Sequence, residues 1–221
     1  MSSSLDSVRA AYDIATEAYA RKFVSELDHK PFDCALLKRF AASVDEGRPV
    51  LDLGCGPGHT PAHLTSLGLL ATGVDLSPRM IEIASQTFPQ SRFEVGDFCS
   101  LRHESSSVAG ILAFYCIVHL TPEQLVPAFA EMHRVLSDDG VLLLSFHVGT
   151  EMLRAENFLE TSAALDFTFF EPSQIETLLR SVGFDWVDVR VRAPYETEHP
   201  SQRGYILALK PRNAASQKDQ P

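Results

Sequence analysis

The stretch of residues 50–60 constrains the fold more than any other part of this 221-residue sequence. It begins as a short, mostly apolar run, contains Gly54, Gly56 and Gly58, and continues into a segment compatible with a helix. Glycines allow positive φ angles and let a ligand approach main-chain N–H groups. The start of a helix adds unpaired N–H groups and the positive end of its dipole. The order strand, tight turn and helix therefore predicts a binding site for a polar or anionic ligand.

The spacing of these glycines argues against two common phosphate-binding turns. A dinucleotide-binding turn has the pattern G-x-G-x-x-G, but His59 occupies the third glycine position and Gly58 comes one residue early. A phosphate loop ends in Gly-Lys-Ser or Gly-Lys-Thr, and no lysine follows Gly58. Both interpretations are weakened.

A second apolar run, residues 71–74, ends in Asp75, which lies 21 positions after Gly54. At the carboxyl end of a neighbouring parallel strand, a carboxylate at about this separation can accept hydrogen bonds from ribose hydroxyls. Ser77 is a typical helix cap and Pro78 suits a first helical turn. We therefore expect a second strand–helix unit beside the first, with Asp75 facing the same ligand.

Three motifs in this order resemble those of class I S-adenosylmethionine-dependent methyltransferases: residues 52–58, residues 74–77 and residues 96–98. The resemblance implies S-adenosylmethionine as cofactor and S-adenosylhomocysteine as product. It further implies that Asp97 accepts a hydrogen bond from the adenine amino group. The cofactor-binding residues that it implies are Tyr19, Asp52, Gly54, Cys55, Gly56, Gly58, Asp75, Leu76, Met80, Gly96, Asp97, Phe98, Phe114 and Tyr115.

The resemblance and the alternation of apolar runs with helical periods together predict an α/β fold. We expect a doubly wound, Rossmann-like, seven-stranded sheet that is mostly parallel and has an antiparallel last strand. One domain of residues 1–211 is expected, with a helical cap at 1–47 and a candidate lid at 149–170. Residues 212–221 are polar and are expected to form a flexible tail.

The helical cap and the candidate lid carry the expected substrate contacts. In the family that the chain resembles, such N-terminal helices lie across the mouth of the cofactor site, which makes Tyr12 and Tyr19 candidates for ligand contact. The alternative for Tyr12 is packing on the core. Residues 149–170 include Phe158 and other aromatic residues suited to an apolar acceptor, and the alternative is a helix and loop that cover the sheet edge.

His119 and His147 both fall just past the ends of predicted strands, on the expected ligand side. Each is a candidate general base, and each is also a candidate substrate-binding residue together with Tyr12 and Phe158. The alternative for both is a histidine satisfied by a backbone carbonyl. His59 and His63 have a spacing that can share a metal, but no third ligand is in view, so no metal site is predicted.

Composition limits the class of partner. The formal net charge is −10, from 19 Lys and Arg against 29 Asp and Glu, whereas nucleic-acid binding draws on clustered basic residues. No apolar run reaches the roughly 18 residues that a membrane helix needs, and the four cysteines are widely spaced. We expect a cytoplasmic protein with a small-molecule substrate, no nucleic-acid or membrane partner, and no disulfide framework.

The predicted activity is methyl transfer to an oxygen or nitrogen atom of a small, partly apolar molecule. The protein positions the acceptor in line behind the activated methyl group, with a histidine as candidate general base. The alternative is a cofactor-binding protein of the same fold that transfers no methyl group, either a regulatory module or an enzyme that uses the sulfonium charge only.

Overall fold

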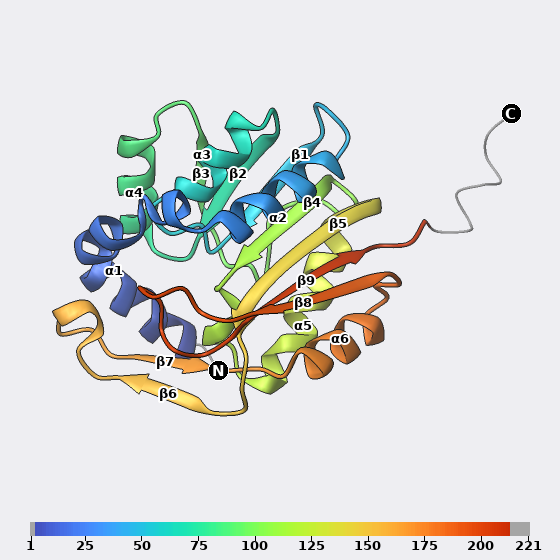
Figure 1. Cartoon of the computed structure of the whole chain (residues 1–221). Helices are drawn as coiled ribbons and strands as arrows, with labels where there is room; N and C mark the ends of the chain where they lie inside the picture. The colour runs from blue at the N-terminus through green and yellow to red at the C-terminus, as the bar shows by residue number, and fades with distance from the viewer. Residues whose placement is uncertain (1–2, 213–221) are drawn as a thin grey trace, which may run out of the picture.

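A computed structural model describes residues 3–212, and its centre is a seven-stranded sheet with the order β3-β2-β1-β4-β5-β9-β8 (Figure 1). Every strand is parallel to its neighbours except β9, which is antiparallel to both β5 and β8. The expected mostly parallel sheet with an antiparallel last strand is confirmed. The strands of the sheet are β1 (Pro49–Leu53), β2 (Leu70–Asp75), β3 (Arg92–Val95), β4 (Val108–Phe114), β5 (Leu136–His147), β8 (Val187–Arg192) and β9 (Arg203–Leu209).

Helices follow the strands as a doubly wound fold requires, and their start signals act as the sequence predicts. Ser77 caps the helix after β2, because its side chain accepts a hydrogen bond from the N–H of Met80 at 3.1 Å. The α-helices are α1 (Ser3–Phe23), α2 (Pro31–Ala42), α3 (His59–Ser66), α4 (Pro78–Thr87), α5 (Pro122–Val135) and α6 (Pro172–Ser181). Short 3₁₀ helices are η1 (Glu26–His29), η2 (Ile117–His119) and η3 (Phe158–Glu160).

The sheet is buried on both faces, which explains why its central strands are near-continuous apolar runs. One core lies between the sheet and the helices α5 and α6, and includes Phe129 and Leu179. The other lies under α2 and α3, and includes Phe40 and Leu64. Burial of both faces holds the strands firmly, so that their carboxyl ends present loops in fixed positions.

Helix α1 is the longest described helix of residues 1–47, the segment expected to form a cap. It packs against α4 and against η3, so it crosses the side of the molecule where the strands end (Figure 1). Asp13 of α1 accepts a hydrogen bond from Ser77 at 2.5 Å. The cap is therefore joined to the turn that follows β2 by a polar contact as well as by packing.

The segment 149–170 differs from the sequence expectation, because it contains a regular hairpin. Strands β6 (Met152–Ala155) and β7 (Leu165–Thr168) pair antiparallel in a separate two-stranded sheet. Leu165 is buried against Ala11 and Ala15 of α1. The hairpin was missed because its strands have four residues each, which is too short for an alternating pattern to stand out.

Two helix ends are determined by strand pairing and by a proline. Helix α5 ends at Val135, because Leu136 already pairs with Val108 of β4. A register shift follows before Gly110 pairs with Val141. Helix α6 begins at Pro172, which suits the first helical position, and Glu171 occupies the N-cap position without a side-chain hydrogen bond.

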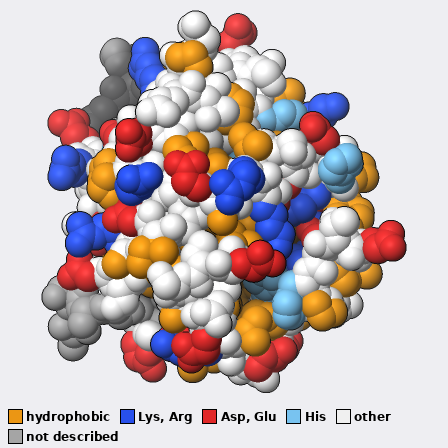
Figure 2. Space-filling view, turned by 90° about the vertical axis from the view of Figure 1, so that its left-hand side faces the viewer, with side chains coloured by type: hydrophobic (Ala, Val, Ile, Leu, Met, Phe, Trp, Pro, Cys, Tyr) orange, Lys and Arg blue, Asp and Glu red, His pale blue; other side chains and the backbone are white. Residues whose placement is uncertain are grey.

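Outside the sheet, the surface carries charges of both signs. On the face with α1, α4 and the β6–β7 hairpin, Lys and Arg side chains are interspersed with Asp and Glu (Figure 2). None of the helices within residues 3–212 combines the length and apolar character that crossing a bilayer demands. The predicted tail lies, apart from Arg212, outside the described residues.

Candidate active site

The turn after β1 has the backbone that its glycines predict. Gly54, Gly56 and Gly58 have φ angles of 68°, 52° and 88°, a region that glycine alone adopts without strain. A Cβ on Gly54 would overlap the Cβ of Cys116. The N–H of Gly54 donates to the carbonyl of Val74 at 2.7 Å, which joins the turn to the end of β2.

Asp75, at the end of β2, faces this turn as expected. Its Oδ2 accepts a hydrogen bond from the N–H of Gly56 at 2.8 Å, and its Oδ1 accepts one from the N–H of Ser77 at 2.9 Å. Burial raises the pKa of Asp75 to about 6, although these two N–H groups oppose the rise. The carboxylate is thus held rigidly between the two turns that begin α3 and α4.

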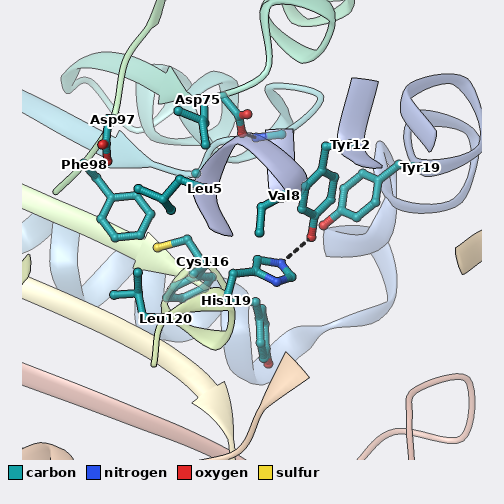
Figure 3. A pocket seen from close by; sticks show the side chains of 15 residues that line it. Leu5, Val8, Tyr12, Tyr19, Asp75, Asp97, Phe98, Cys116, His119 and Leu120 are labelled. Carbon is teal, nitrogen blue, oxygen red and sulfur yellow. Dashed lines mark hydrogen bonds between the residues drawn. The ribbon is translucent and has the colours of Figure 1, made fainter. Parts of the chain in front are cut away.

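A cleft opens between the strand ends and α1, with about 650 Å³ of space, part of which is open to solvent. Asp75, Asp97 and Phe98 lie on one side of it, and Tyr12, Tyr19 and His119 lie on the other (Figure 3). Eleven of the predicted residues line the cleft: Tyr12, Tyr19, Gly54, Gly56, Asp75, Leu76, Asp97, Phe98, Phe114, Tyr115 and His119. The strand order therefore brings all three sequence motifs to one site.

Apart from Cys55, which is buried in the glycine turn and lines the smaller chamber described below, six predicted residues lie outside this cleft lining, and four of them support it from behind. Gly58 caps α3, where a Cβ would come within 2.7 Å of Phe93, and Gly96 packs as closely against Val74. Met80 is buried below Ser77. Phe158 contacts the ring of Tyr12 at a centroid distance of 6.0 Å.

Asp52 is the fifth such residue. It is only 2% exposed, it hydrogen-bonds Thr60, and its Oδ2 has no partner among the described residues. Burial raises the pKa of this carboxyl well above its ordinary value. Asp52 therefore braces the start of α3 from below the glycine turn.

His147, the sixth, lies behind Tyr115. Its ring stacks on Phe169 at 5.0 Å, and its Nδ1 shares a hydrogen bond with Ser201 at 2.8 Å. Burial, followed by the charge of Arg203, lowers the pKa of His147 to about 3. The ring is thus an uncharged packing partner, separated from the cleft by the ring of Tyr115 at 5.5 Å.

His119 is the histidine that reaches the cleft. Its Nδ1 lies 2.9 Å from the carbonyl oxygen of Asp166 on β7, and its Nε2 lies 2.8 Å from the hydroxyl of Tyr12 on α1. Burial lowers the pKa of His119 to about 4, so the imidazole is neutral at physiological pH. The ring also packs against Phe167 at 5.0 Å.

Tyr115 follows β4 in a left-handed conformation with φ of 54°, which a bulky residue rarely adopts. Its N–H donates to the carbonyl of Ser145 at 3.0 Å, and its hydroxyl shares a hydrogen bond with Tyr205 at 3.1 Å. Burial raises the pKa of Tyr115 to about 12. Strain of this kind persists where surrounding contacts fix the residue, as happens at functional sites.

A buried ionic network supports Tyr205 from behind. Arg192 binds Asp33 at 2.9 Å and Glu198 at 2.6 Å, and Tyr205 donates to Asp33 at 2.9 Å. The three charged side chains are 10% exposed or less. The network ties the start of α2 to β8 and to the loop before β9.

A smaller, polar chamber lies on the other side of Tyr19 and shares Gly54 and Gly56 with the cleft. Lys30 binds Glu26 at 2.7 Å and Glu198 at 3.2 Å. His59 contacts the other oxygen of Glu26 at 3.0 Å. The segment 26–30 therefore contributes charged groups of both signs, Glu26 and Lys30, to the site.

Sequence reasoning missed further lining residues. Leu5 and Val8 precede Tyr12 by seven and four positions, so they share its helix face, and this periodic signal was available in the sequence. Cys116 and Leu120 lie in the loop after β4, between residues that were predicted. Lys30 carried no signal for this role, because its second partner, Glu198, is remote in sequence.

Comparisons with known proteins found a matching family model and several sequence relatives. Residues 50–140 match the family model described as a methyltransferase domain. YodH of Bacillus subtilis, an uncharacterized methyltransferase, is 30% identical over 76% of this chain and 72% of its own length. The O-methyltransferase cnsE of Penicillium expansum is 26% identical over 65% of this chain and 54% of its own length.

Solved structures show the same fold. Magnesium protoporphyrin IX methyltransferase (ChlM) from Synechocystis PCC 6803 with bound S-adenosylhomocysteine is similar with a TM-score of 0.73 and 17% identity. The similarity covers 94% of this chain and 99% of that chain. The chain spans about half the length of other curated relatives that it matches.

Proposed function

The chain belongs to the class I S-adenosylmethionine-dependent methyltransferases, and from this premise we propose that it methylates an oxygen or nitrogen atom of a small, partly apolar molecule. Its cofactor is S-adenosylmethionine, and the product is S-adenosylhomocysteine. The net charge of −10 and the interspersed charges on the face in Figure 2 support a small acceptor, since nucleic-acid binding needs clustered basic residues.

The described residues fit the nucleoside part of this cofactor. The backbone of Gly54 and Gly56 leaves a cradle beside Asp75, whose carboxylate is suited to ribose hydroxyls. Leu76 and Phe98 offer an apolar border for the adenine ring. We assign Asp97 to the adenine amino group, because it lines the same side of the cleft.

The polar chamber beside Gly56 fits the amino-acid end of the cofactor. This end carries both an ammonium and a carboxylate, and the chamber offers Glu26 and Lys30, which have the opposite charges. When the zwitterionic end of the cofactor binds, Glu26 and Lys30 each exchange one protein partner for a group of the ligand. The chamber therefore compensates the desolvation of both ends.

The acceptor is assigned to the side of the cleft where His119 meets Tyr12. The single observation that carries this assignment is the pair of contacts made by the imidazole, to the Asp166 carbonyl at 2.9 Å and to the Tyr12 hydroxyl at 2.8 Å. They hold a neutral ring nitrogen at the cleft, where it can take a proton. His147 has no such position, so we assign the base to His119.

The low basicity of His119 fixes the timing of proton transfer. Its pKa of about 4 lies about six pH units below that of a phenol, so complete deprotonation before methyl transfer would cost about 8 kcal/mol. An oxygen loses basicity sharply as it gains the methyl group. We therefore assign a concerted role, in which the proton moves to His119 as the new bond forms, and the bound cofactor supplies a methyl group activated by its positive sulfur.

The test of this function has two arms. The first is a screen for S-adenosylhomocysteine formation across phenols, alcohols, amines, thiols and carboxylic acids. The second compares His119→Ala with the exposed control His29→Ala. We expect turnover to fall about 10²- to 10⁴-fold in the first variant only, with unchanged affinity for S-adenosylhomocysteine by calorimetry. Equal turnover by wild type and His119→Ala would remove the base from the mechanism.

A further inference from the structure

The two contacts of His119 determine which of its nitrogens carries the hydrogen. The carbonyl oxygen of Asp166 can only accept a hydrogen bond, so Nδ1 must be the donor at that 2.9 Å contact. Because the buried ring is neutral, Nε2 then has no hydrogen and presents a lone pair. The hydroxyl of Tyr12 must donate to it at 2.8 Å. The nitrogen that faces the cleft is therefore a hydrogen-bond acceptor.

This tautomer is held by the fold. Asp166 lies on β7, opposite Arg154 of β6, and the two side chains form an ion pair at 3.0 Å. Phe167, the next residue, packs its ring on the imidazole at 5.0 Å. The hairpin thus fixes both the carbonyl that receives the Nδ1 hydrogen and the plane of the ring. Moving the hydrogen from Nδ1 to Nε2 would leave a lone pair of Nδ1 facing the carbonyl oxygen of Asp166 and would lose that hydrogen bond.

Charged groups near this nitrogen are already engaged. Among the described residues that line the cleft, Asp75 and Asp97 are the acidic ones, and each accepts hydrogen bonds from main-chain N–H groups. Two cations that lie over the ring of Tyr115 are also paired, Lys30 with Glu26 and Glu198, and Arg203 with main-chain carbonyls. With the cofactor bound, Lys30 and Glu26 would hold its amino-acid end, so a charged reacting group would enter this end of the cleft without a partner.

An unpaired charge is costly to bury, whereas a hydroxyl needs only an acceptor for its hydrogen. A carboxylate would face the lone pair of Nε2 and find no free cation. An ammonium ion would find no free carboxylate, because Asp75 and Asp97 accept main-chain hydrogen bonds on the opposite side of the cleft from His119 (Figure 3). The positive sulfur of the cofactor attracts electron-rich acceptors of every kind, so His119 determines which reacting group is accepted.

We propose that the reacting group of the acceptor is an uncharged hydroxyl that donates its hydrogen to Nε2 of His119 in place of Tyr12, and that the site rejects carboxylates and ammonium ions. This inference rests on the proposed function. In the step, an oxygen lone pair forms the C–O bond, the methyl–sulfur bond breaks with its electron pair going to sulfur, and the hydroxyl proton passes to Nε2. The products are a methyl ether, S-adenosylhomocysteine and, after release to solvent, one proton.

The first test uses compounds that carry different reacting groups on the same aromatic ring: phenol, benzylamine and benzoate, and the same trio built on naphthalene. Turnover with S-adenosylmethionine is followed by S-adenosylhomocysteine release. We expect kcat/KM for the hydroxyl compound to exceed that of the other two at least about 100-fold, as for sites built to receive one hydrogen bond. Preference for the amine or the carboxylate overturns the inference and leaves methyl transfer intact.

The second test does not need a substrate. In protein labelled with ¹⁵N-histidine and loaded with S-adenosylhomocysteine, the signals of His119 are assigned by their loss in His119→Gln. We expect Nδ1 to carry hydrogen and Nε2 to carry none between pH 5.5 and 8, the range well above the pKa of about 4. A protonated Nε2 overturns the inference even if no compound of the first test is methylated. Failure to bind S-adenosylhomocysteine would instead contradict the proposed function.

Discussion

Replacement of Asp75 by Asn is predicted to stabilise the free protein while it abolishes cofactor binding. The carboxylate lies deep in the cleft, and burial raises its pKa from 3.8 to about 6. At about 1.36 kcal/mol per pH unit, this difference corresponds to at most about 3 kcal/mol of native-state destabilisation when the group is ionised. An asparagine carries no such charge.

The sign of the effect follows from the pH at which the carboxyl ionises in the native and in the unfolded protein. Below pH 3.8 it is protonated in both native and unfolded protein and contributes nothing, and between pH 3.8 and about 6 it ionises in the unfolded chain first. Above about pH 6 the full cost is present in the native protein. The variant loses one main-chain hydrogen bond, about 1 kcal/mol, because an amide nitrogen cannot accept. A net gain of about 2 kcal/mol is expected at pH 7.5.

The assay is urea unfolding of wild type, Asp75→Asn and the control Asp97→Asn, which changes a second acid of the same cleft. Measurements at pH 7.5 and pH 4, with and without S-adenosylhomocysteine, distinguish the cost of burying the charge from the stabilisation by bound ligand. We expect Asp75→Asn to exceed wild type at pH 7.5 only, and to gain nothing from the ligand. An Asp75→Asn variant that is less stable than wild type at pH 7.5 would refute this reasoning.

Three further predictions test the turn, the ionic network and the base. Gly54→Ala should lose about 3 kcal/mol of unfolding free energy, because it combines a left-handed φ with overlap on Cys116. The control Gly47→Ala has a positive φ but open space around the added Cβ, so it should lose only about 1–2 kcal/mol. Equal losses in the two variants would disprove the overlap. Arg192→Met should destabilise by about 3–5 kcal/mol, since it removes the cation that binds the buried Asp33 and one of those that bind Glu198; urea midpoints within error of wild type would contradict this. The kcat at saturating cofactor should stay level as pH falls from 8 to 5 and drop near pH 4, where His119 gains a proton; a drop centred near pH 6.5 would show an unperturbed base.

Much of the fold was predictable because its signals are local. The glycine turn, Asp75 and the Ser77 cap each depend on residues within one strand–turn–helix unit, and parallel pairing then brings the units together. The face of α1 was equally readable, since Leu5, Val8 and Tyr12 recur at helical spacing.

The remaining features depend on contacts between distant parts of the chain. Lys30 is paired with Glu198, which lies in the loop before β9, and nothing in the local sequence marks either partner. The tautomer of His119 depends on a main-chain carbonyl of β7. Every residue has such a carbonyl, so the sequence does not indicate which one contacts the imidazole. Short strands such as β6 are fixed by their register with a neighbour rather than by their own composition.

The central claim is that the bend after β1 and the acid at the end of β2 bind one nucleoside whose charge is on sulfur. Calorimetric titration of wild type and Asp75→Ala with S-adenosylmethionine, S-adenosylhomocysteine and NADH tests it directly. We expect wild type to bind the first two and not NADH, and the variant to lose most of that affinity. Preferential binding of NADH, or undiminished binding by the variant, would contradict the account.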